Sequence, residues 1–429
     1  MRTLIKNGRI IQKDNELEKC DIWIEDDLIY AIGQSFENRA TSFDKVYDAR
    51  NQLVSPGLID VHVHFREPGF EYKETIKTGS LAAAHGGFTQ VCAMPNLNPV
   101  PDTADKMKKM LEKIAKDAVV KVHQYAPITR NRESEVELVN FSALKNTGAW
   151  NFSNDGSGVQ MAGTMYRAMV EAAKVGKTIV AHAEDNSLLN GGVIRGGSRS
   201  QALGIPEMLS IVESSQVARD LLLARQAGCH YHVCHISTKE TVGMIREAKR
   251  AGIHVTCEVT PHHLLLTDED ILEDDAKWKM NPPLPSKEDR EALMVGLLDG
   301  TIDMIATDHA PHAAYEKETN FLNGAFGIVG LEQAFSLLYS NLVEKGVATL
   351  EQLIHWMSTY PAEIFGMDGG SLQIGKPADL VVIDIQREFT IDEQDFESKG
   401  RNTPFLGSKV RGEVLLTFVD GRLVWRKSK

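Results

Sequence analysis

Residues 60–69 read DVHVHFREPG, and this stretch places His62 and His64 two positions apart. Side chains at that spacing on a β-strand point to the same side, so both imidazoles can bind one metal ion where the strand ends. For an isolated HxH motif, however, a pair of half-buried structural histidines is the more common explanation. The surrounding sequence therefore has to decide between a metal site and a structural pair.

Downstream of this motif, short apolar strands alternate with amphipathic helices, which is typical of parallel βα units. Glycines such as Gly86, Gly87 and Gly252 precede several of the strands, where the C-terminal caps of helices belong. The eight predicted strands are residues 58–64, 89–94, 119–125, 149–154, 178–182, 231–235, 254–259 and 302–307. This pattern predicts an α/β fold with a (β/α)8 TIM-type barrel, although a doubly wound sheet gives the same alternation.

Both ends of the chain instead show short strands separated by turn residues. The clearest segments are residues 4–6, 21–24, 378–384 and 415–419, and the last is followed by the hairpin signal Asp420-Gly421. We therefore predict that both termini contribute to one small β-sandwich domain. The predicted boundaries are 1–55 and 366–429 for the two parts of this domain and 56–365 for the barrel.

The composition is that of an ordinary globular protein, with 42% hydrophobic and 25% charged residues among 429. A net charge of -12 argues against nucleic acid or an anionic membrane as partner, because both require basic patches, but it leaves room for a small anionic substrate. The five cysteines are scattered without CxxC spacing, and no apolar stretch approaches the ~20 residues of a membrane helix. We expect a cytoplasmic protein that acts on a small molecule.

Four later strands also end next to a side chain that can bind a metal ion. These side chains are Asp155, His182, His235 and Asp308, after the fourth, fifth, sixth and eighth strands. In a parallel barrel the C-terminal ends of all strands meet at one mouth. Together with the first two histidines, the set suits two zinc-like ions. One carboxylate must bridge them if the ions lie ~3.5 to 4 Å apart, as in two-metal hydrolytic sites.

These residues fall within an ordered series of short motifs. The series comprises HVHFREPG at 62–69, MPN at 94–96, DG at 155–156, AH at 181–182, CHIST at 234–238, KMNPPL at 279–284, ATDHAPH at 306–312, GKPAD at 375–379 and NTPF at 402–405. It resembles the signature series of bacterial class I dihydroorotases and covers nearly the whole chain. The resemblance implies an amidohydrolase-superfamily barrel with two Zn2+ per chain that interconverts N-carbamoyl-L-aspartate and L-dihydroorotate in the synthesis of pyrimidines (UMP).

The resemblance also implies a role for each metal-competent residue. The first metal would be held by His62, His64 and Asp308, the second by His182 and His235, and both by Asp155. A hydroxide between the metals would attack the ring amide, and Asp308 would carry the proton to the leaving nitrogen. Many amidohydrolases bridge their metals with a carboxylated lysine, whereas this chain offers an aspartate, as some members of the family do.

Substrate contacts follow from the same motifs. Arg66 can form a bidentate pair with the α-carboxylate of the substrate, although a surface ion pair with Glu67 or Glu71 is the alternative. The remaining residues that resemble family contacts are Asn96 and His312 for the carboxylate, Asn281 for the ring, and Phe326 and Gly327. For the two asparagines, a turn next to a proline is the alternative.

Three positions depart from the family pattern. Asn154 stands where an aspartate is common, Phe65 where leucine is common, and Gly324-Ala325 where Ala-Pro is usual. The first change removes a negative charge beside the expected metals, and the third could loosen a loop over the substrate. Residues 312–323 are polar enough to form a mobile lid over the site.

Two other functions compete with this interpretation. One is a sister cyclic amidase, such as a hydantoinase, dihydropyrimidinase or allantoinase, but Arg66 argues against it because those substrates lack the carboxylate it would bind. The other is a non-catalytic structural partner of aspartate transcarbamoylase, which the complete set of six metal-competent residues disfavours. A homodimer, and association of an active enzyme with aspartate transcarbamoylase, are further expectations from the resemblance.

Overall fold

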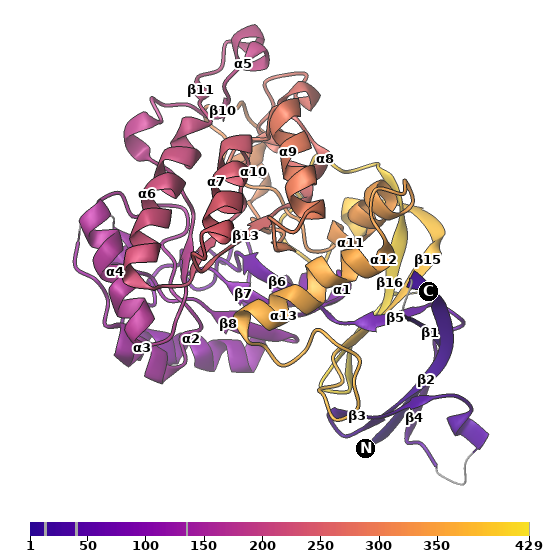
Figure 1. Ribbon diagram of the computed structural model, residues 1–429. Helices are drawn as coiled ribbons and strands as arrows, with labels where there is room; N and C mark the ends of the chain where they lie inside the picture. The colour runs from indigo at the N-terminus through magenta and orange to yellow at the C-terminus, as the bar shows by residue number, and fades with distance from the viewer. Residues whose placement is uncertain (13–14, 39–41, 134–135, 429) are drawn as a thin grey trace.

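The computed structural model describes residues 1–12, 15–38, 42–133 and 136–428. Figure 1 shows a large α/β body and, beside it, a smaller β-rich part in which indigo strands from the start of the chain lie next to yellow strands from its end. The candidate site belongs to the larger part.

Parallel strands in chain order form the centre of the α/β body. One sheet contains β6 (Leu58–Val63), β7 (Phe88–Ala93) and β8 (Lys121–Gln124), and another contains β9 (Ile179–Ala181), β12 (Tyr231–Val233), β13 (Val255–Val259) and β14 (Met304–Ile305). Phe152 joins the two sheets, since it pairs in parallel with Ala126 and with Ile179. Val63 and His309 also pair in parallel, so the pairings return to β6 and complete a circuit.

Seven of the eight predicted strand segments overlap one of these strands, whereas the predicted strand over residues 149–154 is reduced to a single paired residue. Only Phe152 pairs there. Two asparagines explain the interruption, because their side chains bind backbone groups in place of a regular ladder. The Oδ1 atom of Asn151 accepts from the backbone N of Thr178 at 2.9 Å, and that of Asn154 accepts from the backbone N of Ile128 at 2.9 Å.

Helices follow the strands and pack on the outside of the circuit (Figure 1). The longer ones are α1 (Ile76–His85), α2 (Ala104–Asp117), α3 (Phe141–Thr147), α4 (Ala162–Lys174), α6 (Ile211–Ala227), α7 (Lys239–Arg250) and α9 (Lys287–Leu298). Hydroxyl side chains accept hydrogen bonds from the first turns of several helices, as at Thr75, Thr103, Thr238 and Ser286. Short helices complete the body: α5 (Ser198–Leu203), α8 (Pro261–Leu265), α10 (Ala314–Lys317), α11 (Ala334–Leu338), α12 (Leu350–Ile354) and α13 (Tyr360–Phe365).

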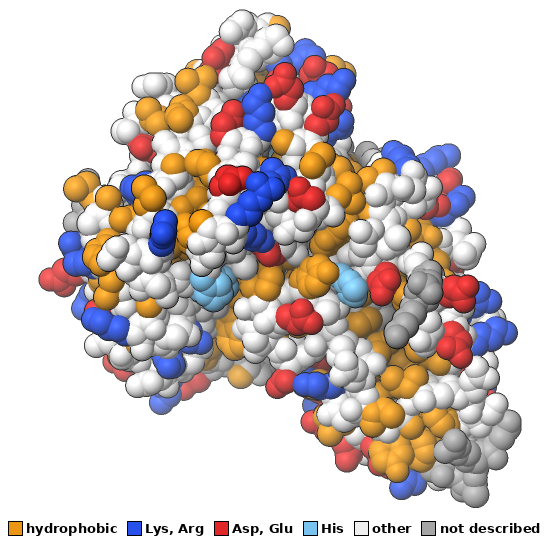
Figure 2. Space-filling view, in the orientation of Figure 1, with side chains coloured by type: hydrophobic (Ala, Val, Ile, Leu, Met, Phe, Trp, Pro, Cys, Tyr) orange, Lys and Arg blue, Asp and Glu red, His pale blue; other side chains and the backbone are white. Residues whose placement is uncertain are grey.

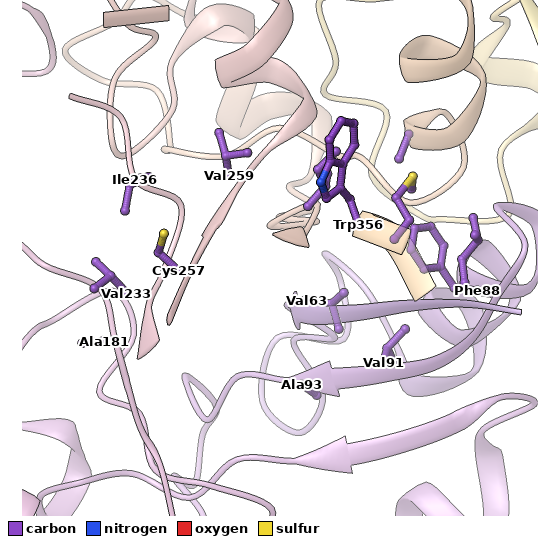
Figure 3. Close-up of a cluster of buried hydrophobic side chains, with 14 of the residues drawn as sticks. Val63, Phe88, Val91, Ala93, Ala181, Val233, Ile236, Cys257, Val259 and Trp356 are labelled. Atoms are coloured by element: carbon purple, nitrogen blue, oxygen red, sulfur yellow. The ribbon is translucent and has the colours of Figure 1, made fainter. Parts of the chain in front are cut away.

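The strands are buried on both faces, which explains their nearly continuous apolar sequences. In β7, Val91 and Ala93 belong to the cluster that packs against the helices, whereas Cys92 belongs to a second cluster on the inner side of the circuit. Figure 3 shows part of the first cluster, with Val91 and Ala93 close to Val63. Because both faces of the strands are covered by apolar side chains, the polar side chains of the site lie at the ends of the strands.

The smaller part is a single sheet built from both ends of the chain. Its strands are β1 (Arg2–Ile11), β2 (Leu17–Glu25), β3 (Leu28–Gly33), β4 (Lys45–Asp48), β5 (Leu53–Pro56), β15 (Leu380–Thr390), β16 (Lys409–Val419) and β17 (Arg422–Arg426). The two ends meet where β5 pairs antiparallel with β15, for example at Val54 and Val382. The predicted hairpin between β16 and β17 is confirmed, since Val419 pairs with Arg422 across Asp420 and Gly421.

The surface carries charges of both signs. Figure 2 shows Lys and Arg side chains interspersed with Asp and Glu over the face that bears α6, α7 and α9. Among the residues that the structure describes, no helix is both long enough and apolar enough to span a membrane.

Candidate metal centre

The six predicted metal-competent residues come together at the ends of the parallel strands, and all are buried. Three overlapping groups have their potential ligand atoms within 4.8 Å of one another: His62, His64 and Asp155; His62, His235 and Asp308; and Asp155, His182 and His235. We call these six residues the metal cluster. The circuit of parallel strands brings them together because His62 and His64 lie at the end of β6 and the other four follow later segments of the circuit.

Within the metal cluster, Asp155 lies between two pairs of histidines. Its Oδ1 atom is 3.4 Å from His62 Nε2, 3.6 Å from His182 Nδ1 and 3.8 Å from His235 Nε2. Its Oδ2 atom is 3.5 Å from His64 Nε2. Asp155 is therefore placed to share its two oxygens between two positions.

Asp308 lies on one side of this arrangement. Its Oδ1 atom is 2.8 Å from His64 Nε2 and 3.3 Å from His62 Nε2. On the opposite side, His182 Nδ1 and His235 Nε2 are 3.0 Å apart. Asp308 therefore belongs with the first two histidines, and the later two form a separate pair.

Unsatisfied polar atoms show that the metal cluster fits a cation. His62 Nε2, Asp155 Oδ1 and His235 Nδ1 are buried and have no hydrogen-bond partner among the described residues. Leaving such atoms unpaired costs roughly 1–3 kcal/mol each, so native proteins rarely do so without a functional reason. Imidazole nitrogens and carboxylate oxygens are the donors that zinc-like ions prefer, and a bound ion would satisfy these lone pairs.

The electrostatics of the metal cluster point the same way. Burial alone would lower the pKa of His62, but the carboxylates around it, Asp308 foremost, raise that pKa well above its ordinary value. Burial opposes ionisation of Asp155 and Asp308, yet the histidines around them, His62 foremost, lower the pKa of both. The site therefore favours positive charge beside its carboxylates, which a divalent cation supplies when it replaces imidazole protons.

Backbone strain also occurs at this site. Arg66, His235 and Asp308 follow three different strands, and their φ angles are +60°, +29° and +47°. Non-glycine residues rarely adopt this left-handed region, and such strain persists where the surrounding structure enforces it, often at functional sites.

A second group of residues, the Arg66 pocket, lies beside Asp308. It comprises Arg66, His312, Phe326 and Gly327. Arg66 Nη2 is 3.4 Å from His312 Nε2, and His312 Nε2 is 2.8 Å from the carbonyl oxygen of Phe326. Burial and the positive charges of Arg66 and Lys73 lower the pKa of His312, so its ring is neutral. Neither carboxylate named as an alternative ion-pair partner of Arg66 is paired with it: Glu67 pairs with Lys113 at 2.6 Å, and Glu71 accepts a hydrogen bond from the backbone N of Gly69 at 3.1 Å.

The two predicted asparagines lie on opposite sides of the metal cluster. Asn96 Oδ1 is 2.9 Å from His64 Nδ1, and Asn281 Nδ2 is 3.4 Å from His182 Nε2. Both amides therefore contact histidines of the cluster, which a purely local turn role does not explain.

The departures from the family pattern have structural counterparts. The neutral side chain of Asn154 binds the loop at Ile128 and Thr129 through both of its polar atoms. Phe65 is buried and packs on Gly79, where an added Cβ would come within 2.5 Å of its ring. A Cβ on Gly324 would come within 2.2 Å of the Ala276 Cβ, so glycine permits close packing of that loop.

The segment predicted as a lid is partly anchored. Lys317 Nζ donates to the carbonyl oxygens of Lys279, Ala325 and Gly327 at 3.1, 2.8 and 2.9 Å. Phe321 is only 1% exposed. Motion of this segment stays a prediction, and any such motion would have to break these contacts.

Sequence analysis missed three residues next to the metal cluster. Glu184 Oε2 is 2.6 Å from Asn281 Nδ2, and Glu258 Oε1 is 2.7 Å from His62 Nδ1. Arg132 donates a hydrogen bond to the carbonyl oxygen of Asp155. The first two carried a signal: Glu184 follows His182 by two positions, and Glu258 is a carboxylate in an otherwise apolar strand.

Comparisons with known proteins agree with this site. A family model described as "Dihydro-orotase-like" matches residues 51–241, and one described as "Amidohydrolase family" matches residues 292–425. The fold is similar to that of L-hydantoinase (dihydropyrimidinase) from Arthrobacter aurescens, with a TM-score of 0.89 and 27% identity, covering 100% of this chain and 96% of that one. D-hydantoinase (dihydropyrimidinase) from a Thermus species gives a TM-score of 0.84 and 26% identity, covering 100% and 97%.

Comparison with curated protein sequences identifies the family more specifically. A dihydroorotase from Enterococcus faecalis (strain ATCC 700802 / V583) is 61% identical over 425 residues, which is 99% of each chain. A dihydroorotase from Ligilactobacillus salivarius (strain UCC118) is 57% identical over 430 residues, or 100% of each chain. With this identity over its whole length, and with a buried cluster of histidines and aspartates that fits a metal cofactor, the chain belongs to the dihydroorotase family of the amidohydrolase superfamily.

Proposed function

We propose that this enzyme catalyses the reversible cyclisation of N-carbamoyl-L-aspartate to L-dihydroorotate and water in pyrimidine synthesis. The observation that carries the proposal is the position of the metal cluster directly beside the Arg66 pocket, since His64 and Arg66 are two residues apart and Asp308 contacts His64 at 2.8 Å. Hydrolytic machinery and a cation for the substrate carboxylate thus lie side by side.

We further infer the finer architecture. The circuit of parallel strands is a (β/α)8 barrel, and the sheet from both termini closes into a β-sandwich around a cluster that includes Ile5, Ile22, Val382 and Phe418. The similarity to hydantoinases over the whole chain supports this assignment. The domain boundaries remain those proposed from the sequence, 1–55 and 366–429 for the sandwich and 56–365 for the barrel.

We assign two zinc ions to the metal cluster. His62, His64 and Asp308 would hold the first ion, His182 and His235 the second, and Asp155 both, because its two oxygens face both halves of the cluster. When bound, the two ions supply Lewis acidity, which lowers the pKa of a shared water and polarises the amide carbonyl.

Asp308 moves the proton. In the hydrolytic direction its carboxylate accepts a proton from the attacking water and then donates it to the ring nitrogen, as the C–N bond breaks and the C–O bond forms. In the biosynthetic direction the carbamoyl nitrogen gives up a proton to Asp308 as the C–N bond forms. Asp308 returns this proton to the departing oxygen of the side-chain carboxylate, which takes a second proton from solvent and leaves as water. Its place next to His62 and His64 lets one residue serve both steps.

The Arg66 pocket binds the α-carboxylate of the substrate. Arg66 is oriented by the bond from its Nε atom to the carbonyl oxygen of Pro311 at 3.3 Å, and its Nη2 atom faces His312. Asn96 reaches the same carboxylate from the side of His64, and Asn281 holds the ring on the side of His182. Phe326 and Gly327 close the pocket through their backbone.

A hydantoinase-type activity on neutral rings is the second candidate, favoured by the similarity to L-hydantoinase at 27% identity. A homodimer, assembly with aspartate transcarbamoylase and a cytoplasmic location stay predictions. Sedimentation of the purified protein, alone and with aspartate transcarbamoylase, tests the first two.

The direct test is to incubate zinc-loaded protein with N-carbamoyl-L-aspartate, and separately with L-dihydroorotate, and to identify the products by NMR. The proposal predicts that both reactions reach the same equilibrium mixture. No conversion in either direction by protein with bound metal would overturn it.

A further inference from the structure

Glu258 is a buried carboxylate on β13 that meets a histidine at each of its oxygens. Oε1 is 2.7 Å from His62 Nδ1, and Oε2 is 3.0 Å from His232 Nε2. The backbone N–H of His235 also donates to Oε1 at 3.3 Å. All of these groups are essentially inaccessible to solvent. One side chain thus contacts two residues of the metal cluster that come from different strands.

A line of polar side chains holds Glu258 from the other direction. His232 Nδ1 is 2.8 Å from Thr256 Oγ1, and the same hydroxyl oxygen is 2.8 Å from His230 Nε2. His230 Nδ1 is in turn 2.9 Å from Thr178 Oγ1. Each ring nitrogen in this line has a partner, so the line fixes the orientation of His232 and, through it, that of Glu258.

The hydrogen bond to Glu258 decides which nitrogen of His62 can bind a metal. A carboxylate only accepts, so the proton of a neutral His62 ring must sit on Nδ1 and the lone pair on Nε2. His62 Nε2 is buried, has no hydrogen-bond partner in the part of the chain that the structure describes, and lies 3.4 Å from Asp155 Oδ1 and 3.3 Å from Asp308 Oδ1. The lone pair therefore points into the metal cluster.

We propose that Glu258 is a positioning residue of the metal centre. It sets the tautomer and ring orientation of His62, and through the amide of His235 it links a second ligand strand to the first. The inference rests on the proposed function, because it requires that the metal cluster hold metal ions. Carboxylates that orient metal-bound histidines in this way typically contribute a factor of 10–100 in metal affinity.

A direct ligand role is the rival explanation. His62, Cys234 and Glu258 also have potential ligand atoms within 4.8 Å of one another. If Glu258 bound a metal there, Cys234 would be a ligand of the same ion. Cys234→Ala separates the two roles, because a positioning residue needs nothing from that sulfur.

The test measures zinc content and zinc affinity, by competition with a chelator, together with the visible spectrum of the cobalt-substituted protein. We expect Glu258→Leu to weaken binding of at least one ion by roughly 10–100-fold and to change the cobalt spectrum. Glu258→Gln should lose less, since its amide oxygen can still accept from His62 Nδ1. His232→Leu should weaken zinc binding by a smaller factor. The double variant with Glu258→Leu and His232→Leu should bind zinc as tightly as Glu258→Leu alone.

Asp220→Leu is the matched control. Asp220 on α6 is also a fully buried carboxylate, held by the Tyr231 hydroxyl at 3.0 Å and by Arg219 at 2.8 Å, and it lies outside the metal cluster. It tests whether loss of any buried carboxylate disturbs metal binding. We expect zinc affinity and the cobalt spectrum of Asp220→Leu to match those of the wild type.

Three results would overturn the inference: folded Glu258→Leu with wild-type affinity and spectrum, an equal loss in Asp220→Leu, or loss of the same ion in Cys234→Ala. If Glu258→Leu does not fold, the zinc affinity and cobalt spectrum of Glu258→Gln and His232→Leu test the inference in its place. Failure of the proposed function looks different, because it appears as missing conversion of L-dihydroorotate by the zinc-loaded wild type, whereas the Glu258 inference is decided by metal affinity and the cobalt spectrum, which are measured without substrate.

Discussion

At the scale of single residues, Asp308 is placed both to hold a metal and to carry a proton. Asp308→Ala removes the carboxylate next to His64, so we expect turnover of L-dihydroorotate to fall by at least roughly 10²–10⁴-fold, the usual contribution of a general acid or base. Steady-state kinetics on protein of measured zinc content check this. Near-normal turnover with full zinc content would remove Asp308 from the proton path.

Arg66 is expected to act on binding more than on chemistry. Replacing it with methionine removes a charge-assisted hydrogen bond worth about 1.5–3 kcal/mol, so the KM for L-dihydroorotate should rise by roughly 10–100-fold with a small change in kcat. The matched control is Arg246→Met, because Arg246 forms an exposed ion pair with Asp299 outside the site. A fall in kcat at unchanged KM would contradict the role given to Arg66.

The six residues of the metal cluster could be predicted from sequence motifs, because each lies at the end of a predicted strand. They could not show how each side chain is supported. Glu258 and Arg132 act through contacts between distant parts of the chain, with His62 and the carbonyl oxygen of Asp155, and no local spacing encodes such contacts. The same holds for Asn154, whose side chain binds a loop at Ile128 and Thr129.

At the scale of elements, the position of the segment after α10 depends on the hydrogen bonds of one buried lysine, Lys317. Burial lowers the pKa of Lys317 from 10.5 to about 7. Between about pH 7 and 10.5 the unfolded chain therefore holds a proton that the folded chain has released, and stability rises with pH in this window. We expect the free energy of unfolding of the wild type, relative to Lys317→Met, to rise by up to about 1.4 kcal/mol per pH unit there.

Chemical denaturation of both proteins across this pH range gives the measurement. Lys174→Met serves as control, because the Lys174 side chain is 63% exposed and pairs with Glu171 on the surface of α4. Its stability difference from the wild type should not vary with pH. A flat difference for Lys317→Met as well would show that Lys317 keeps its ordinary pKa in the folded chain.

Most strands could be predicted from apolar runs bounded by turn residues, but residues 149–154 could not. The sequence there has the composition of a strand, and the asparagine side chains that interrupt the ladder find their backbone partners at Thr178 and Ile128, which are distant in sequence. Propensity describes local preference, and here tertiary hydrogen bonds override it.

At the scale of the whole molecule, the two chain ends pair with each other in one sheet. The pairing of β5 with β15 joins residues more than 300 positions apart, which the similar strand patterns of the two termini suggested but whose register they could not specify. The alternation of strands and helices likewise left a doubly wound sheet possible, and the pairing of Val63 with His309 shows that the strands form a circuit.

Metal ions should stabilise the whole fold. Any ligand that binds only the native state adds RT ln(1 + [L]/Kd), or about 2.7 kcal/mol at one hundred times Kd. Removing metal with a chelator should therefore lower the Tm, and added zinc should restore it, because the buried carboxylates Asp155 and Asp308 would regain their counter-charge. An unchanged Tm in protein shown to be free of metal would mean that the metal cluster is stable without a cation.

The most direct test of the central claim compares turnover of L-dihydroorotate with that of hydantoin, dihydrouracil and allantoin on one preparation whose zinc content is also measured. We predict a strong preference for L-dihydroorotate at about two zinc ions per chain, as expected for a binuclear hydrolase. Protein with bound zinc that hydrolyses only the neutral rings would contradict the account.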